Sequence, residues 1–498
     1  MSVLLFSLFA FSFAAPPELM TNHGPVIGEE LPGGVRVFRS IPFGAAPVGP
    51  LRFRDPIPPV SWSVPRDVVG LPNACPQLKL DGNVFVGNED CLYLSLFLPP
   101  PESVKGGGAA PIMFFIYGGA YVVGDAWELG WYDGAALAKK GVIVVVANYR
   151  VGPFGFFASP ALAAENPGGS NGNAALLDQV LALEWTRDNA AAFGGDATQV
   201  TIFGESAGAF SVAWHVASPR SKNLFSAVIS ESGSFEVPQF FQPLNDAIAF
   251  NTVYGEALGC GNADSALALA CLRSLSTERI MLSLADWLNP NWPNVGSGPA
   301  ALNQLREIWA TIHVGSSSSS EMTSPTLPAL APVMPWGPAI DGVALLMSPL
   351  AAVRAGAFNN VPMILGSNKN EGSIFVPIFP VIAKGVSFPP KAGDAALMIE
   401  HAFDMYPAEV VRNLTNNLVL PAYPLLAYGN DTWAQTSDMI THAVFTCSNR
   451  RTSKALVDAN VQTWLYQFSY KIDWIETQLL PVLGTCEEVG GVGRDIEI

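Results

Sequence analysis

The stretch that decides the fold is FGGDATQVTIFGESAGAF, residues 193–210. Its middle part, QVTIFG (199–204), is rich in β-branched and aromatic residues and predicts a buried strand. The strand runs directly into GESAG (204–208), and an apolar helical run follows. A serine at such a sharp turn is held with its hydroxyl exposed, and flanking glycines avoid collisions with the adjoining strand and helix. The stretch therefore favours Ser206 as a nucleophile over an ordinary strand–turn–helix junction.

Strand-like and helical runs alternate on both sides of this turn, which is typical of an α/β fold. Several strands are apolar throughout, so we expect them to be buried on both faces of a central sheet. The run 171–193 predicts a helix, and the Ser/Pro-rich run 314–332 predicts an exposed loop. We expect one large domain with a mostly parallel sheet flanked by helices. Its clearest strands are predicted at 92–99, 111–118, 142–149, 199–204, 225–232 and 361–368.

A second glycine-rich element, FFIYGGAYVVG (114–124), follows one of these apolar strands. Consecutive small residues let the backbone fold so that its N–H groups converge on one point, as in the oxyanion loops of lipases and esterases. The N–H of Ala207 would point to the same kind of oxyanion from the nucleophile turn. Taken alone, the second element fits a plain glycine-rich turn equally well.

Charge and composition narrow the classes of partner. The 498 residues carry a formal net charge of −16, which argues against nucleic acid and anionic membranes. Hydrophobic residues make up 49% and charged residues 14%, enough for a large core. We expect neutral or apolar small molecules as substrates. No metal-ligand cluster or cofactor motif is visible, so we expect neither a metal nor an organic cofactor.

The N-terminus and the cysteines suggest an oxidising compartment. The apolar run 3–15 is too short to span a bilayer but fits a signal peptide over residues 1–15, although no Lys or Arg precedes it. A buried N-terminal strand is the alternative. Glycosylation sequons begin at Asn413 and Asn430, and we expect a secreted protein without a stable membrane anchor. Among six cysteines, Cys75 with Cys91 and Cys260 with Cys271 could close short loops, whereas Cys447 and Cys486 pair or stay free.

At this point the chain resembles the type B carboxylesterase family, which includes cholinesterases and secreted fungal lipases and esterases. Residues 193–208 match the nucleophile signature of the family, and EDCLYLSLFLP (89–99) matches its second signature. The match covers roughly residues 22 to 486. We therefore expect an α/β-hydrolase domain over 16–486 and an atypical tail over 487–498. Further stretches that fit in order and spacing are 37–53, 148–157 and 339–375.

The resemblance implies roles for individual residues. It makes Ser206 the nucleophile of a carboxylic ester hydrolase and Glu371, in NKNEGSIF (368–375), the acid that orients the base. Without the resemblance, Glu371 would be read as a surface carboxylate, and Glu205 is expected to give structural or electrostatic support. The family places its two common disulfides at the two cysteine pairs given above. The expected oxyanion donors are the N–H groups of Gly119, Ala120 and Ala207.

The general base is the residue that the sequence lacks. Fungal relatives place a histidine just after a stretch similar to PVLGT (481–485), but here Cys486 and Glu487 follow. Losing that histidine typically costs about a million-fold in turnover, so we expect this chain to be nearly inert. A truncated or mis-spliced active esterase is favoured over a pseudoenzyme or binding protein. A replacement base is not expected from Glu487 or from the five histidines, His23, His215, His313, His401 and His442.

Two features bear on substrate size. The loop between Cys75 and Cys91 is short compared with the flap of fungal lipases, so we expect activity on soluble or short-chain esters without strong interfacial activation. The aromatic run SFEVPQFFQP (234–243) lines an acyl pocket or packs in the core, and the sequence does not separate the two. The oligomeric state is not predicted.

Overall fold

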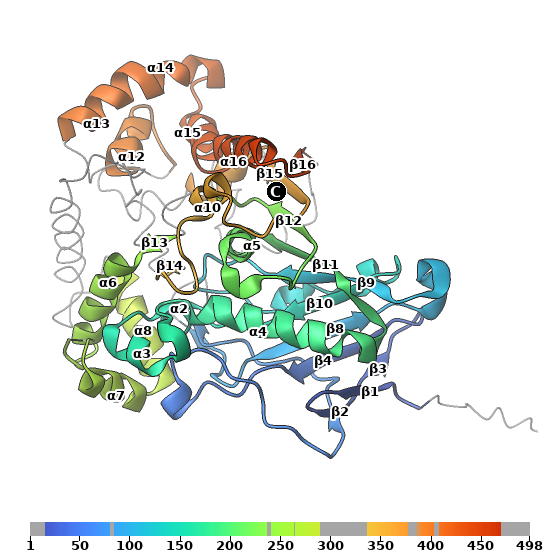
Figure 1. Ribbon diagram of the computed structural model, residues 1–498. Coiled ribbons are helices and arrows are strands. Elements are labelled where there is room, and N and C mark those ends of the chain that lie inside the picture. The colour runs from blue at the N-terminus through green and yellow to red at the C-terminus, as the bar shows by residue number, and fades with distance from the viewer. Residues whose placement is uncertain are drawn as a thin grey trace, which may run out of the picture.

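The computed structural model describes residues 15–79, 84–236, 241–262, 264–288, 336–376, 386–387, 389–402 and 408–469. At its centre is a nine-stranded mixed sheet in the order β16-β15-β12-β11-β9-β10-β8-β4-β3 (Figure 1). Adjacent strands from β16 through β15, β12, β11 and β9 to β10 are parallel. The pairs β10–β8, β8–β4 and β4–β3 are antiparallel. Their bounds are β3 Glu29–Glu30, β4 Arg36–Pro42, β8 Tyr93–Leu98, β9 Ala110–Ile116, β10 Ile143–Ala147, β11 Gly195–Glu205, β12 Ala227–Glu231, β15 Met363–Asn368 and β16 Thr463–Phe468.

The predicted sheet is confirmed strand by strand, and its apolar runs explain its position. Every residue of β10 is buried, as expected for a parallel strand covered on both faces. Helix α4 (Ala174–Asn189) packs on β10 and β11, and α5 (Ala207–Ala217) packs on β9, β11 and β12. Both helices contact β11, and Figure 1 shows α5 beside β12 and α4 below it, beside β10. The expected helix over 171–193 is therefore α4 with one short 3-10 turn, Ala190–Phe193.

Smaller elements surround this sheet. Three short sheets pair β1 (Glu18–Thr21), β2 (Gly24–Ile27) and β5 (Arg66–Asp67), β6 (Gln77–Leu78) with β7 (Phe85–Val86), and β13 (Gln242–Pro243) with β14 (Ala339–Ile340). The remaining α-helices are α1 Ala135–Ala138, α2 Gly152–Phe156, α3 Pro160–Glu165, α6 Leu244–Ala257, α7 Ala266–Ser274, α8 Thr277–Leu288, α10 Pro349–Ala355, α12 Asp394–Ala402, α13 Ala408–Leu414, α14 Leu420–Ala422, α15 Thr432–Ile440 and α16 Cys447–Asp458.

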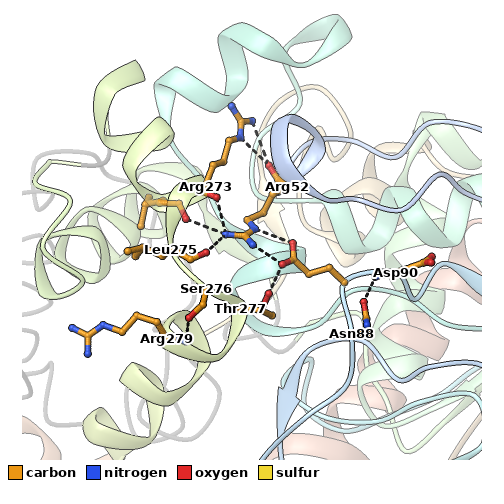
Figure 2. A network of polar contacts seen from close by, with 10 residues as sticks. Arg52, Asn88, Asp90, Arg273, Leu275, Ser276, Thr277 and Arg279 are labelled. Carbon is orange, nitrogen blue, oxygen red and sulfur yellow. Dashed lines mark hydrogen bonds and ion pairs between the residues drawn. The ribbon is translucent and has the colours of Figure 1, made fainter.

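A buried arginine joins the first half of the domain to helix α7 (Figure 2). The Arg52 guanidinium donates through Nε and Nη2 to the Glu89 carboxylate, at 2.8 and 2.6 Å. Its Nη1 donates to the carbonyl oxygens of residues 272 and 273 in the last turn of α7 and of residue 275, just after that helix. Terminal carbonyls of a helix carry partial negative charge and lack intrahelical partners, so the cation satisfies them. The network therefore ties α7 and the start of α8 to the segment that carries Glu89.

Both expected disulfides are present. Cys75 pairs with Cys91 and Cys260 with Cys271, and their Cα atoms lie 5.0 and 5.5 Å apart. Among the described cysteines, Cys447 forms no disulfide, and it is partly buried. Residues 1–14, the run 314–332 and the segment from 470 onward, with Cys486 and Glu487, lie outside the described residues.

Candidate active site

Ser206 occupies the turn between β11 and α5. Its backbone angles are φ 54° and ψ −121°, a conformation that costs a non-glycine residue about 1–3 kcal/mol. The Ser206 N–H donates to the carbonyl oxygen of Glu231 on the neighbouring strand β12, at 2.9 Å. Because strained backbone persists only where the surroundings fix it, this turn holds a partly exposed serine in a defined place.

Glycines on both sides of Ser206 are required by the packing. A Cβ on Gly208 would lie 1.9 Å from the carbonyl oxygen of Ile116, the last residue of β9. A Cβ on Gly204 would lie 2.7 Å from the same oxygen and from the backbone of Gly208. The expected collision with the adjoining strand and helix is therefore real at both positions.

The glycine-rich element after β9 lies against this turn. A Cβ on Gly118 would lie 3.1 Å from the Cβ of Ser206. Three successive residues have positive φ, Gly119 at 96°, Ala120 at 55° and Tyr121 at 62°. The carbonyl oxygen of Gly119 accepts from the N–H groups of residues 122 and 123, both at 3.0 Å. The structure thus brings the two sequence-predicted backbone elements together, and Ala207 is buried beside them.

Gln77 fixes the far end of the same element. Its Oε1 accepts from the N–H of Gly124 at 2.8 Å, and its Nε2 donates to the carbonyl oxygen of Gly124 at 2.9 Å. The same Nε2 also donates to the carbonyl oxygen of Cys75 at 3.0 Å. The disulfide-closed loop therefore holds the glycine-rich turn directly. The sequence analysis did not predict this contact, because no pattern of residue types around Gln77 indicates it.

Glu371 lies at the same edge of the sheet, after β15, and β12 separates that strand from β11. It starts a 3-10 turn, Glu371–Ile374, directly after β15, and its side chain is buried at 7% exposure. Asn368 donates to its carboxylate through the backbone N–H at 2.7 Å and through Nδ2 at 3.2 Å. Burial raises the pKa of Glu371, and hydrogen bonds from Ser232 and Asn368 partly offset that rise. The reading of Glu371 as a surface carboxylate is therefore wrong.

The strand register places Ser206 and Glu371 after two strands, β11 and β15, that are separated by β12. Glu205 on β11 pairs with Glu231 on β12, which pairs in turn with Gly366 on β15. Three carboxylates thus gather at this edge. Burial is the main cause that raises the pKa of Glu205 to about 8, and the negative charges of Glu371, Glu231 and Glu128 add to it. At neutral pH Glu205 therefore keeps its proton.

The three histidines with described side chains are engaged elsewhere. Both ring nitrogens of buried His215 have partners, Nδ1 with Ser221 Oγ at 2.7 Å and Nε2 with Gln179 Oε1 at 3.0 Å. Burial lowers the pKa of His215 to about 3, so it is neutral near pH 7. His442 pairs through Nδ1 with the Tyr423 hydroxyl at 2.9 Å, and His23 stacks on Trp62. The side chains of His313 and His401 lie outside the described residues.

Other expected features are placed only in part. Phe235 and Phe241 of the aromatic run are buried, and Phe241 packs edge-on against Phe210, four residues after Ser206. Residues 237–240 lie outside the described residues, so the acyl-pocket interpretation stays a prediction. Asn413 and Asn430 are exposed. Within the described part of the chain, no helix is both long and apolar enough to cross a membrane.

Comparison with known proteins gives consistent matches. A sequence profile described as "Carboxylesterase family" matches residues 15–492. A "Crystal protein" of Dictyostelium discoideum is 32% identical over 440 residues, 88% of this chain and 68% of that protein. Liver carboxylesterase 1 of Oryctolagus cuniculus is 30% identical over 483 residues, 92% of this chain and 76% of that protein. The crystal structure of Geobacillus stearothermophilus carboxylesterase EST55 matches with a TM-score of 0.65 and 27% identity, over 91% of this chain and 80% of that one.

Proposed function

The chain belongs to the carboxylesterase family, and we propose that it hydrolyses carboxylic esters through an acyl-enzyme formed on Ser206. The observation that carries this proposal is the strained Ser206 turn packed against the glycine-rich turn at Gly118. Such an arrangement supplies a nucleophile and backbone N–H donors in one place.

The proposed reaction proceeds in two steps. The Ser206 Oγ attacks the ester carbonyl carbon while its proton passes to a base, and the carbonyl oxygen becomes an oxyanion. The N–H groups of Gly119, Ala120 and Ala207 would hold that oxyanion. Its collapse expels the alcohol, which takes up the proton. Water then attacks the acyl-serine in the same way, releasing the carboxylic acid and restoring Ser206.

The base is the open element of this proposal. Glu371 would orient an imidazolium, as the acid of a triad does, but none of the three histidines with described side chains faces it. Residues 470–498 contain no histidine. Oxyanion and binding contributions alone leave roughly a thousand-fold acceleration over water. We therefore expect a slow Ser206-dependent reaction from this chain, which an external base should accelerate.

The deciding experiment is hydrolysis of p-nitrophenyl acetate by the 498-residue chain, with and without added imidazole. Imidazole also cleaves this ester in solution, so Ser206→Ala in the same buffer gives the background. We expect imidazole to raise the rate of the parent well above that of Ser206→Ala. The exposed-serine control, Ser63→Ala, should behave as the parent does. Equal rates for the parent and Ser206→Ala under both conditions would overturn the proposal.

A second function, ligand binding without catalysis, is favoured by one observation, the absence of a base among the described histidines. In that case the parent and Ser206→Ala would bind a short ester equally, and imidazole would not separate their rates. The nucleophile turn and Glu371 argue for the enzyme, because a binding protein has no need of a strained serine.

We also propose that the substrates are short or soluble esters. The short β6–β7 hairpin between Cys75 and Cys91 supports this, since it leaves little chain for a flap. The rate with imidazole should follow the concentration of a soluble ester smoothly through its micelle point. A sharp rise at that point would contradict the proposal.

Secretion stays a proposal as well. Two disulfides and exposed sequons at Asn413 and Asn430 fit an oxidising export route. Expression in a eukaryotic host should give a product in the medium that loses mass on enzymatic deglycosylation. The double variant Asn413→Gln and Asn430→Gln should show no such loss, whereas an unglycosylated parent retained in the cells would contradict secretion.

A further inference from the structure

Two buried tyrosines, Tyr117 and Tyr149, pack against each other next to the glycine-rich turn. The rings of Tyr117 and Tyr149 stack with centroids 4.3 Å apart and planes 16° apart, and both side chains are fully buried. The Tyr117 hydroxyl donates to the carbonyl oxygen of Tyr149 at 3.0 Å and accepts from its N–H at 3.1 Å. These contacts join the first residue after β9 to the second residue after β10.

The hydroxyl of Tyr149 points the other way, toward the turn itself. It donates to the carbonyl oxygen of Tyr117 at 2.7 Å and lies 3.4 Å from the carbonyl oxygen of Gly118. In a trans peptide the C=O and N–H point in opposite directions. Holding the carbonyl of Gly118 on the side of Tyr149 therefore turns the N–H of Gly119 to the opposite side of that peptide, away from Tyr149.

The next peptide, between Gly119 and Ala120, is fixed by hydrogen bonds within the turn itself. The carbonyl oxygen of Gly119 accepts from the N–H groups of residues 122 and 123, so the N–H of Ala120 points away from them. The carbonyl of Tyr121 accepts from the N–H of Gly152 at 2.7 Å, just after the segment that carries Tyr149. Of these contacts, the Tyr149 hydroxyl is the side-chain donor: its single proton is directed at the carbonyl of Tyr117, and the carbonyl of Gly118 is a weaker second acceptor.

We propose that Tyr149 is a positioning residue that fixes the peptide planes of Tyr117 and Gly118 and thereby aims the oxyanion N–H group of Gly119. The inference rests on the proposed function of Ser206. In this proposal, a buried side chain outside the glycine-rich element orients a backbone N–H that would hold the oxyanion.

The chemistry of a phenol suits this task. A hydroxyl with its proton donates to a carbonyl without bringing a charge into the core. Burial holds the pKa of Tyr149 well above its ordinary value, so the donor persists across the working pH range. Phenylalanine would keep the ring stack and lose only the donor, which makes Tyr149→Phe a narrow probe.

The first measurement is amide hydrogen exchange by mass spectrometry. In Tyr149→Phe, the peptide covering 118–124 should exchange faster by about tenfold or more, because the hydrogen-bonded amides of residues 122 to 124 lose their support. The matched control is Tyr254→Phe, which removes a buried phenol that donates to the carbonyl oxygen of Ile280. That control should leave exchange at 118–124 as in the parent, even if its midpoint of unfolding falls.

The second measurement is the Ser206-dependent hydrolysis of p-nitrophenyl acetate in imidazole. A misplacement of about 1 Å in a catalytic constellation can cost about a hundred-fold. We expect kcat of Tyr149→Phe to fall at least about tenfold with KM within about threefold. Tyr254→Phe should show no such split between kcat and KM.

Each outcome decides the inference. Faster exchange at 118–124 together with a kcat loss confined to Tyr149→Phe supports it. Unchanged exchange in Tyr149→Phe, or equal losses in both phenylalanine variants, overturns it. If the parent and Ser206→Ala hydrolyse the ester at the same rate, the proposed function fails. The exchange experiment then still decides whether Tyr149 holds the turn.

Discussion

The turn that carries Ser206 and the turn that carries Glu371 lie at the same edge of the sheet, yet different contacts hold them. Around Ser206 the contacts are backbone against backbone. The last residue of β9 leaves no room for a side chain at Gly204 or Gly208, and these contacts lie in the centre of the sheet.

Around Glu371 the contacts reach to a helical segment far along the chain. The N–H of Gly372 donates to Thr441 Oγ1 at 2.9 Å, and a Cβ on Gly372 would lie 2.0 Å from the carbonyl oxygen of Ser437. The nucleophile turn is thus fixed by adjacent strands of the sheet, whereas the acid turn depends on packing against α15 and the residues after it. We therefore expect damage at the first turn to unfold the domain and damage at the second to stay local.

The largest effect is expected from Gly208→Ala. The new Cβ would lie 1.9 Å from the carbonyl oxygen of Ile116, so strand β9 or helix α5 must move within a buried core. We expect a loss of more than about 4 kcal/mol in the free energy of unfolding, which for many domains means insoluble protein. Gly70→Ala, at a position with open space around it, is the control and should unfold as the parent does. A Gly208→Ala protein of parental stability would refute the packing argument.

Gly372→Ala should cost less, although the contact it creates is almost as close. Its Cβ would meet the carbonyl oxygen of Ser437 on α15, which lies outside the central sheet, so we expect the displacement to be taken up by this helix. We expect a loss of about 1–3 kcal/mol in stability. Exchange should accelerate in peptides covering 371–376 and 432–441 and not in 199–210. Equal losses for Gly208→Ala and Gly372→Ala, measured by denaturant unfolding, would remove the distinction between the two turns.

The same contrast explains what the sequence could predict. The Ser206 turn is encoded by consecutive residues, a strand, GESAG and a helix, so its presence could be predicted from local sequence, although β9 and β12 also hold it. Glu371 was assigned through resemblance, because its burial depends on Asn368, Ser232 and a helix about 70 residues away. The anchors Gln77 and Tyr149 were not predicted. Their role depends on which backbone groups tertiary packing brings within 3 Å of them, and no residue pattern encodes that.

Glu205→Gln tests the protonation state of Glu205, which lies in the carboxylate cluster between the two turns. The folded protein keeps a proton on Glu205 up to a pKa of about 8, whereas the unfolded chain releases it near 4.5. Between these values the folded state binds more protons, so stability falls as pH rises. Glutamine cannot ionise and removes this slope.

We expect the midpoint of thermal unfolding of Glu205→Gln to exceed that of the parent at pH 8 and to approach it near pH 4.5. The exposed control Glu102→Gln should follow the parent at every pH. A parallel pH dependence for Glu205→Gln and the parent would mean that Glu205 is ionised in the fold. The acid cluster would then be more solvated than its burial implies.

The smallest effect is expected from His442→Phe. This variant tests whether His442 acts as the general base beside the turn that carries Glu371. The preceding residue, Thr441, accepts a hydrogen bond from the N–H of Gly372, so the backbone of His442 lies beside the turn that carries Glu371. Its Nδ1 nevertheless pairs with the Tyr423 hydroxyl, and the two rings lie 5.7 Å apart, a contact that phenylalanine preserves. We expect a loss of about 1 kcal/mol from the missing hydrogen bond, with the Ser206-dependent rate unchanged within about twofold. Tyr423→Phe removes the same bond from the other side and should match it. If His442→Phe alone abolished the rate measured without imidazole, His442 would be the base, and the acid turn would be a complete catalytic element after all.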